Sequence, residues 1–237
     1  MTIISTFLDL VYPRSCAGCG APVSRNSTHI CWDCLASFDI ITSPFCSICG
    51  DPADGVIEHD YTCSWCKRHR PYFDLARSAV LYRGAVRNAL HSFKYEYITC
   101  LSRDFISLLS ACIDVYYPKI CFDAVTFVPL YPRKERERTY NQARLLANGL
   151  ARILELPLLS NCLHRVRSTV SQTDLTASAR RANVSGAFAA VEKGWLEGRR
   201  LLLVDDVMTT GSTVNECAKV LKQAGAAGVY VVTVARG

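Results

Sequence analysis

The sequence contains no run of about 18 apolar residues, so it predicts no membrane-spanning helix. Its first twelve residues include Asp9 but no early lysine or arginine, and no small-residue cleavage site follows them. This is not the pattern of a signal peptide, and we expect a short amphipathic helix there that packs on the next domain. The chain also lacks the Gly-Lys-Ser or Gly-Lys-Thr of a nucleotide P-loop.

Acidic residues are fewer than basic ones, 21 against 27, and the net charge of +6 indicates anionic ligands without proving nucleic-acid binding. Half of the 237 residues are hydrophobic, which is enough for a substantial core. The length fits one α/β domain of about 150 residues with a smaller domain beside it. We expect the smaller domain at residues 1–72 and the α/β domain at residues 73–237.

The chain has thirteen cysteines, and eight of them form four Cys-x-x-Cys pairs within residues 16 to 66. Two cysteines at this spacing cannot bridge each other without strain, whereas paired Cys-x-x-Cys units are typical of metal sites. The pattern favours a reducing compartment, and we predict a cytoplasmic location. The remaining cysteines are expected to be buried as small hydrophobic side chains; they are Cys100, Cys112, Cys121, Cys162 and Cys217.

A repeat offset by 30 residues organises the four pairs. The pattern Cys-x-x-Cys-Gly-x-Pro begins at Cys16 and again at Cys46, and a second pair follows each after 11 or 13 residues. Four thiolates with no open position predict a closed structural zinc site in each repeat, and binding would supply about 10–16 kcal/mol of folding energy per site. A brace that mixes the pairs remains open, as do an iron–sulfur cluster and redox-active dithiols. The predicted ligands are Cys16, Cys19, Cys31 and Cys34 in one site and Cys46, Cys49, Cys63 and Cys66 in the other.

Residues 201 to 213 combine a buried strand, two acids and a loop of small hydroxyl residues. Four apolar residues run directly into Asp205 and Asp206, and a helix is expected at residues 214 to 223. Unpaired N–H groups at a helix start favour a phosphate in such a loop, and Gly211 lets the backbone approach it. The carboxylates fit a ribose diol or Mg²⁺, so we predict a sugar-phosphate site. An acidic strand end before a capped helix is the alternative. The loop hydroxyls belong to Thr209, Thr210, Ser212 and Thr213.

Strands and helices alternate along the rest of the chain, which predicts an α/β fold with a parallel sheet. Strands are expected at residues 76 to 82, 124 to 129 and 228 to 235, and helices at residues 84 to 93, 101 to 116 and 142 to 154.

Two basic segments lie between these elements. Residues 131 to 142 are predicted to form a mobile loop at the carboxyl edge of the sheet, where Arg133 and Arg138 would bind pyrophosphate. A solvated run of alternating Glu and Arg is the alternative. Residues 164 to 183 predict a flexible flap over the site or a track for single-stranded DNA. The basic side chains of this second segment include Arg165, Arg167, Arg180 and Arg181.

Residues 201 to 213 resemble the phosphoribosyl-pyrophosphate-binding motif of type I phosphoribosyltransferases at every constrained position. With the paired zinc ribbons, the chain resembles the ComF family over essentially its whole length. One departure is Thr139, where the family usually has glycine, and lost backbone freedom there would alter how the pyrophosphate loop closes. The other segments that carry the resemblance are residues 10–13, 93–94, 128–130 and 140–142, together with Arg167, Gln172, Thr173, Leu175, Arg180 and Asn183.

The resemblance implies a type I phosphoribosyltransferase fold, with a mainly parallel sheet, helices on both faces and a small hood, after an N-terminal double zinc ribbon. It implies that phosphoribosyl pyrophosphate binds with Mg²⁺, and it implies a link to natural transformation or use of external DNA. Asp205 and Asp206 would be the catalytic pair that takes the ribose hydroxyls, with Asp206 as a candidate base. The implied donor site comprises Asp205, Asp206, Val207, Thr209, Thr210, Gly211, Ser212, Thr213, Arg133 and Arg138.

Two hypotheses from different classes follow from these features. The first is an enzyme that transfers the phosphoribosyl group to an acceptor that the sequence does not identify. The second is a non-catalytic module of the competence machinery that binds a phosphoribosyl compound and single-stranded DNA, with DNA-uptake proteins as candidate partners. The sequence leaves both open, and it does not define an oligomeric state.

Overall fold

A computed structural model of the chain describes residues 14–23, 29–53, 55, 57, 60–168, 177–191 and 193–237. The helix predicted at residues 1 to 12 lies outside these described residues. Within the described ranges, no helix combines the length and the apolar character that crossing a bilayer requires.

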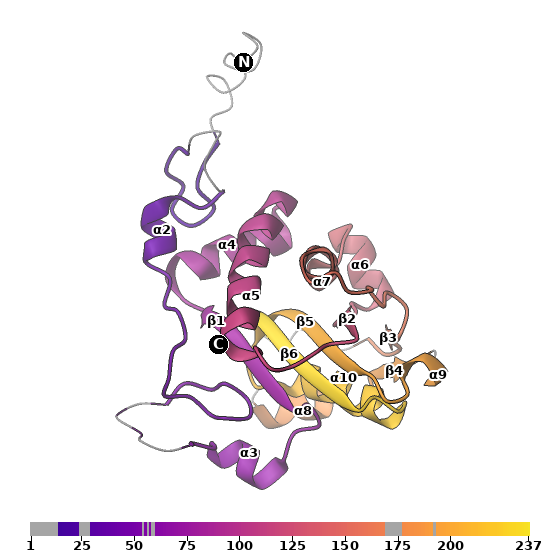
Figure 1. Cartoon of the computed structure of the whole chain (residues 1–237). Helices are drawn as coiled ribbons and strands as arrows, with labels where there is room; N and C mark the ends of the chain where they lie inside the picture. The colour runs from indigo at the N-terminus through magenta and orange to yellow at the C-terminus, as the bar shows by residue number, and fades with distance from the viewer. Residues whose placement is uncertain are drawn as a thin grey trace.

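A parallel sheet lies at the centre of the molecule (Figure 1). Its strands within the described ranges are β1 (Leu75–Leu81), β6 (Gly228–Arg236), β5 (Arg200–Met208) and β2 (Ala124–Phe127), in that spatial order. Side chains of β5 alternate between two cores, because Leu202 and Val204 pack on one side and Leu201 and Leu203 on the other. A strand buried on both faces explains the unbroken apolar run in the sequence, and the parallel sheet predicted from it is confirmed.

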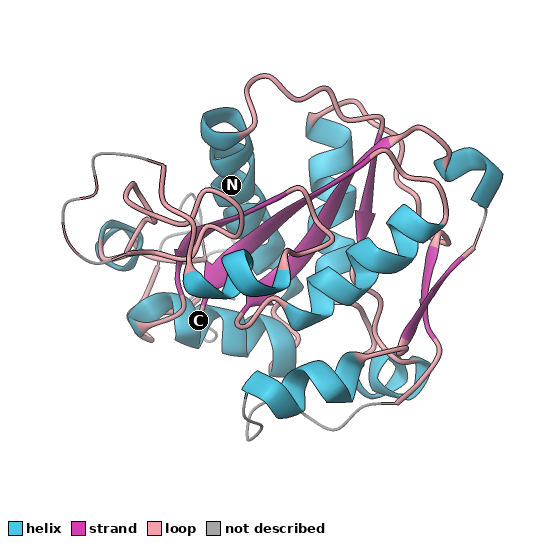
Figure 2. Cartoon of the chain, turned by 90° about the horizontal axis from the view of Figure 1, so that it is seen from below, coloured by secondary structure: helices cyan, strands magenta, loops and turns pink. Residues whose placement is uncertain are grey.

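Helices cover both faces of this sheet (Figure 2). On one side, α4 (Gly84–Tyr95), α5 (Ser102–Tyr116) and α7 (Gln142–Ile153) bury their apolar faces, and the short 3₁₀ helix η1 (Thr99–Leu101) precedes α5. On the other side lies α10 (Ser212–Gln223), with α8 (Ala177–Val184) packed against it. The three layers are the arrangement that the alternation of strands and helices predicts.

The segment predicted as a mobile arginine-rich loop is a helix instead, so that prediction is wrong. Residues Pro132–Arg138 form α6, which begins with proline at its first position and carries an Arg133–Glu137 ion pair one turn apart. The alternation of Glu and Arg therefore marks the exposed surface of a short helix. Thr139 ends it in the left-handed region, with φ of 62°.

The described parts of the second basic segment form a strand and a helix. Residues Leu163–Arg165 form β3, which pairs antiparallel with β4 (Phe188–Ala190), and α8 lies between them in the chain. Three-residue strands are too short for their periodicity to be recognised in a sequence. Residues 169 to 176, which include Gln172, Thr173 and Leu175 of the family resemblance, lie outside the described residues.

The two cysteine-rich repeats lie on opposite faces of the sheet at its β1 edge. The first, with α2 (Trp32–Ala36), joins the core of α4, α5 and α7, and the second, with α3 (Ser64–His69), joins the core of α10. The segment between them runs along β1, where Ile41 N donates to Ala79 O at 3.0 Å and Leu81 N donates to Asp39 O at 2.9 Å. This connection covers the edge strand and leaves neither repeat with a core of its own.

Three of the five scattered cysteines are buried as expected, and two are not. Cys112, Cys162 and Cys217 are buried, whereas Cys100 and Cys121 are exposed. The two exposed thiols lie in connections, one at η1 and one just before β2, where no second layer covers them.

Candidate functional sites

The loop after β5 forms a small hollow at the start of α10. Gly211 adopts φ of 73°, a conformation that favours glycine, and a methyl group there would also lie 2.7 Å from the flexible end of Met208, at Cε. The Thr210 and Ser212 hydroxyls are hydrogen-bonded to each other at 2.8 Å, at the N-terminus of the 12-residue helix. The hollow is lined by Asp205, Val207, Met208, Thr209, Gly211, Ser212, Thr213 and Val214. Its geometry is that of a helix N-terminus open to a phosphate.

The two acids lie side by side at the end of β5. The Asp206 backbone N–H donates to Asp205 Oδ1 at 2.9 Å. Burial, followed by the negative charge of Asp206, raises the pKa of Asp205 to about 7. Lys94 forms an ion pair with Asp206, with Nζ 3.1 Å from Oδ1. Burial lowers the pKa of Lys94, but Asp206 outweighs this effect and the net shift is upward.

A cleft of about 970 Å³ opens beside the hollow and the acids. One wall is the polar face of α4, and the other consists of α6, the start of α7 and Arg165 of β3. The lining residues are Tyr82, Arg87, Asn88, His91, Lys94, Tyr95, Val128, Leu130, Lys134, Arg138, Asn141, Gln142, Ala143, Arg165, Asp205, Asp206, Val207, Thr209 and Thr213. The volume is at the upper end of the range for small-molecule sites.

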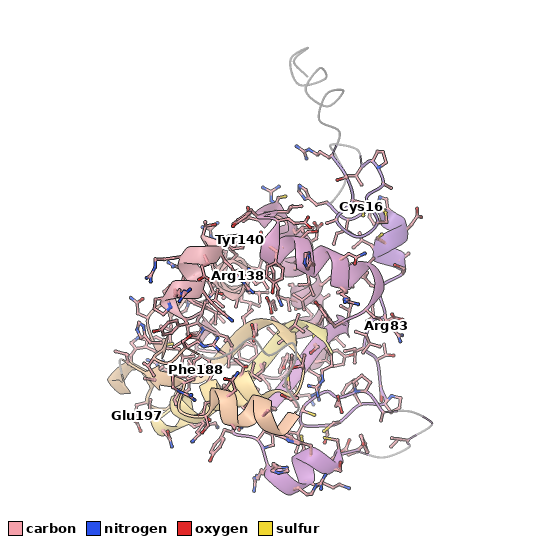
Figure 3. The ribbon with its side chains drawn as sticks, turned by 180° about the vertical axis from the view of Figure 1, so that it is seen from behind. Cys16, Arg83, Arg138, Tyr140, Phe188 and Glu197 are labelled. Atoms are coloured by element: carbon pink, nitrogen blue, oxygen red, sulfur yellow. The ribbon has the colours of Figure 1, made fainter. Side chains whose placement is uncertain are left out.

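Three cations besides Lys94 gather on the wall opposite α4. Burial and the charges of Arg165 and Arg138 lower the pKa of Lys134, and burial lowers that of Arg165. Figure 3 labels Arg138. Its guanidinium donates to Tyr95 OH at 3.1 Å and lies over the same ring, 4.8 Å from the ring centroid. Like charges held together in a partly buried cleft favour a polyanionic ligand.

Two predicted site residues lie elsewhere. Arg133 does not line the cleft; its Nε donates to Glu137 Oε1 at 2.9 Å on the exposed side of α6. Arg167 donates to the backbone oxygens of Asn183 at 3.1 Å and Ser185 at 2.7 Å, so it ties the end of β3 to the end of α8. The side chains of Arg180 and Arg181 lie outside the described residues. The hollow, the acids, Arg138 and Arg165 are thus the predicted features that come together.

The sequence prediction missed most of the α4 wall. Lys94 and Lys134 had no assigned role, nor had the residues of α4 that face the cleft. A signal exists, because Arg87, His91 and Tyr95 recur every four residues, which is the spacing of one helix face. A polar helix face that follows a strand predicts a wall at the carboxyl edge of the sheet.

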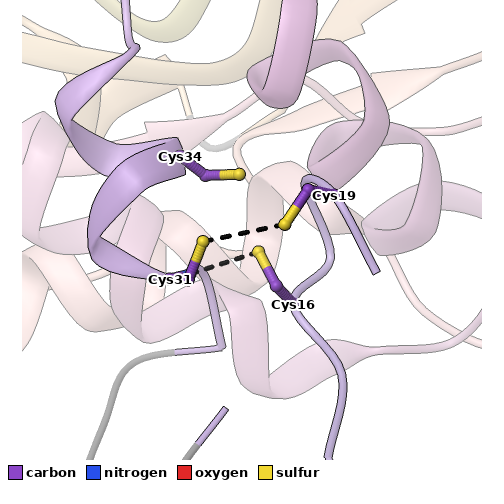
Figure 4. Close-up of side chains that lie close together, drawn as sticks. All are labelled: Cys16, Cys19, Cys31 and Cys34. Atoms are coloured by element: carbon purple, nitrogen blue, oxygen red, sulfur yellow. Dashed lines mark hydrogen bonds between the residues drawn. The ribbon is translucent and has the colours of Figure 1, made fainter. Parts of the chain in front are cut away.

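The eight paired cysteines form two sequential groups. Within each group the sulfur atoms all lie within 4.8 Å of one another, as Figure 4 shows for the first. Cys19 Sγ lies 3.7 Å from Cys31 Sγ, and Cys49 Sγ lies 3.8 Å from Cys63 Sγ. A tetrahedron with Zn–S distances of about 2.3 Å has edges of about 3.8 Å, so both Cys₄ sites fit zinc binding. The pairs within the described residues are not mixed between the repeats.

Backbone N–H groups face the sulfurs in both sites. The Cys31 and Gly18 N–H groups donate to Cys16 Sγ at 3.2 and 3.3 Å, and Cys63 N donates to Cys46 Sγ at 3.4 Å. Burial raises the pKa of Cys16, but these donors outweigh it and lower the pKa to about 6. Donors around the sulfurs stabilise the thiolate form that binds a metal.

The two sites differ in their surroundings. Cys19 is exposed in the first, whereas all four cysteines of the second are buried. Two buried arginines contact the second repeat: Arg77 donates to Ser47 O at 2.9 Å, and Arg236 donates to Asp51 Oδ1 at 2.8 Å. The second site is therefore enclosed by the protein body, and the first is open to solvent on one side.

Known proteins share this organisation. A double zinc ribbon domain family matches residues 7–67, and a phosphoribosyl transferase domain family matches residues 141–237. Competence protein F of Haemophilus influenzae is 34% identical over 220 residues, covering 90% of this chain and 94% of the relative. DNA utilization protein YhgH of Escherichia coli K12 is 31% identical over 230 residues, covering 94% and 96%. Competence protein ComFC of Bacillus subtilis is 30% identical over 206 residues, covering 86% and 82%. The chain therefore belongs to the ComF family, with a double zinc ribbon joined to a domain of the type I phosphoribosyltransferase fold.

Proposed function

We propose that the chain binds phosphoribosyl pyrophosphate with Mg²⁺ and transfers the phosphoribosyl group to an acceptor. The supporting observation is that an acidic pair and four half-buried cations line one cleft, which opens beside a hollow at a helix N-terminus. The loop from residue 209 to 213 would hold the 5′-phosphate, and the carboxylates of the acidic pair would hold the ribose hydroxyls. Lys134, Arg138 and Arg165 would neutralise the pyrophosphate.

Mg²⁺ would reach this cleft with the donor, and carboxylate oxygens of Asp205 and Asp206 are ligands of the type that it prefers. It would supply positive charge to the leaving pyrophosphate. The protein's own contribution is to orient the donor and to stabilise the charge that develops on the leaving group.

Asp205 is better suited than Asp206 to take a proton from the substrate that accepts the phosphoribosyl group. A base works best when its pKa lies near the ambient pH, and the pKa of Asp205 is raised to about 7. Asp206 instead forms an ion pair with Lys94, with Nζ 3.1 Å from Oδ1. The two acids therefore differ in their direct partners, and Asp205 is the better candidate for the base.

Calorimetric titration with phosphoribosyl pyrophosphate and Mg²⁺ tests the binding. Changing both acids to Asn removes the partners of two hydroxyl groups, so we expect a loss of about 100-fold or more in affinity. Asp33→Asn with Asp114→Asn is the matched control, because both side chains are exposed and neither lines the cleft. Equal affinity in wild type and the Asp205/Asp206 variant would remove the assigned role. Pyrophosphate release with candidate acceptors then tests the transfer.

The two arginines of α6 form a second matched pair. Arg138→Ala removes a cation from the cleft, and we expect binding about 10-fold weaker. Arg133→Ala removes the same charge from the exposed side of the same helix and should leave the affinity unchanged. Similar effects of the two changes would mean that only the overall charge matters.

We propose further that this function serves uptake or use of external DNA, because relatives carry the names competence protein and DNA utilization protein. DNA-uptake proteins are then candidate partners. The thiolate metal sites favour a cytoplasmic location for this work, since they persist in a reducing compartment.

A second candidate function is non-catalytic binding of single-stranded DNA at the mouth of the cleft. Tyr95 is 54% exposed and carries Arg138 over its ring, and Tyr97, 56% exposed, donates to Glu137 O. Exposed rings together with a cation are the combination of stacking surface and charge that single strands require. Affinity should fall with salt at a log–log slope of about −0.7 per phosphate contacted. Changing Arg165, Arg167, Arg180 and Arg181 to Ala should flatten that slope. Competition by phosphoribosyl pyrophosphate would place both ligands on one surface, and no binding at low salt would discard this candidate.

A further inference from the structure

Lys94 pairs directly with one of the two acids of the loop motif. Its Nζ lies 3.1 Å from Asp206 Oδ1, and the two side chains are only 16% and 13% exposed. No other ion pair involves Asp205 or Asp206 among the pairs formed by the described residues. An exposed ion pair of this kind would contribute little to stability, but this pair is largely buried and lies in the cleft that would hold the donor.

The backbone at Lys94 is fixed to the opposite wall. Gln142 Nε2 donates to Lys94 O at 3.4 Å, and the Tyr140 hydroxyl donates to Phe93 O. The last turn of α4 is therefore tied to the start of α7. The ammonium, on its flexible four-carbon stem, can still change partner while the Cα stays in place.

A conflict arises when the donor arrives. On the proposed function, Asp206 must accept hydrogen bonds from ribose hydroxyls, yet Lys94 already occupies one of its oxygens. A nearly buried ammonium cannot be left without an anion, because removing one partner of a buried pair is strongly unfavourable. Asp205 also lines the cleft and its charge also acts on Lys94, but on the proposed function the ribose hydroxyls take Asp205 as well. The cations Lys134, Arg138 and Arg165 of the same lining offer Lys94 no partner. The anion that arrives is the diphosphate of the donor itself.

We propose that Lys94 is a positioning residue that exchanges partners: it holds Asp206 in the free protein and turns to the donor diphosphate when the ribose takes Asp206. This inference rests on the proposed function. It makes Lys94 the group that distinguishes a ribose bearing a diphosphate from ribose 5-phosphate. Ribose 5-phosphate would have to break the ion pair without supplying a new anion at that point, and phosphoribosyl pyrophosphate would supply one.

The test compares two ligands on Lys94→Met by calorimetry, each with Mg²⁺. Phosphoribosyl pyrophosphate should bind at least 10-fold more weakly than to wild type, because the diphosphate loses a cation. Ribose 5-phosphate should bind as tightly as to wild type or a few-fold more tightly, because Asp206 is released. Lys222→Met is the matched control: it removes a lysine that pairs with Asp74 at 2.8 Å away from the cleft, and both affinities should stay unchanged.

If Lys94→Met lowers the affinity for both ligands equally, Lys94 has only a structural role and the inference is overturned. Undiminished affinity for phosphoribosyl pyrophosphate would overturn it as well. A wild-type chain that binds neither ligand would instead refute the proposed function. Should Lys94→Met fail to fold, wild-type protein labelled with ¹⁵N-lysine gives a second readout. The ammonium resonance that Lys94→Arg removes should shift when phosphoribosyl pyrophosphate is added, and an unchanged resonance at saturation contradicts the exchange.

Discussion

The cysteine repeat provides two glycines that share a conformation and differ in their surroundings. Gly20 and Gly50 each follow the second cysteine of their repeat, with φ of 79° and 67°. A methyl group on Gly50 would lie 2.7 Å from Ala76 O of β1, whereas one on Gly20 would have nothing within 4 Å. Replacing either glycine by alanine therefore introduces the same backbone strain. Only the replacement of Gly50 also pushes its repeat away from the sheet.

The expected magnitudes follow from these contacts. An L-residue at positive φ costs about 1–2 kcal/mol, and the loss of unfolded-state freedom on replacing glycine offsets about 0.4–1 kcal/mol. Gly20→Ala should thus destabilise by about 1 kcal/mol. In Gly50→Ala the new methyl group also overlaps a backbone oxygen that cannot rotate away. This overlap should lower the free energy of unfolding by about 1–3 kcal/mol more. The overlap also strains the hydrogen bond from Ala76 N to Ile48 O, which is 2.8 Å long.

Thermal unfolding of the zinc-loaded protein measures the difference. In a chain of this size, a loss of about 1 kcal/mol in the free energy of unfolding lowers Tm by roughly 2–4 °C. Gly20→Ala should lower Tm by that amount, and Gly50→Ala by about 4–16 °C. Zinc is measured in both variants to separate metal loss from strain. Equal shifts in the two variants would refute the docking of the second repeat on β1.

Three further predictions concern the metal, the acids and the short helix. Cys16→Ser should lower the zinc content from two ions to one per chain by elemental analysis, whereas loss of both ions would contradict two independent sites. Because the pKa of Asp205 is raised, the folded state holds a proton that the unfolded state releases, so stability should fall as pH rises from about 4 to 7. Asp205→Asn should remove that decline in urea unfolding and stabilise the protein at pH 8 by up to a few kcal/mol, and a parallel pH profile would exclude Asp205 as its source. Thr139→Gly should stabilise the chain by about 0.5–1 kcal/mol by releasing the left-handed strain at φ of 62°, and Thr139→Ala should not; equal effects would mean that backbone strain is not the cause.

Patterns that depend on burial were readable in the sequence. The four apolar residues before Asp205 predicted a strand buried on both faces, since a parallel sheet covered by helices has no polar face. The paired cysteines predicted two metal sites, because few other roles require four thiols at that spacing. Gly211 was identified because glycine lets the backbone of a loop approach a phosphate at a helix start. Its φ of 73° is a further reason for glycine, which the sequence did not reveal.

The parts that the sequence did not reveal depend on which way a helix or strand faces. The charges of α6 were taken for a loop, because alternating Glu and Arg carries no apolar stripe to indicate a helix. Arg133 and Arg138 were predicted together, yet five positions along a helix turn one to solvent and the other to the cleft. The ion pair between Lys94 and Asp206 joins residues 112 positions apart (206 − 94), and only the fold brings them together.

The placement of the two repeats explains why metal ribbons accompany this α/β domain. The first repeat contacts the wall that carries Lys94, since Asn88 Nδ2 of α4 donates to Gly18 O at 2.8 Å. The second contacts α10, the helix that begins at the hollow: Tyr72 N, which follows α3, donates to Asn215 Oδ1 of α10 at 2.7 Å. Phe73 packs in the core below Gly211. Each ribbon thus supports one side of the same cleft from one face of the sheet. Because a Cys₄ site folds its repeat when a metal binds, we expect the geometry between Lys94 and the loop to depend on metal binding in both repeats, although neither site lies in the cleft.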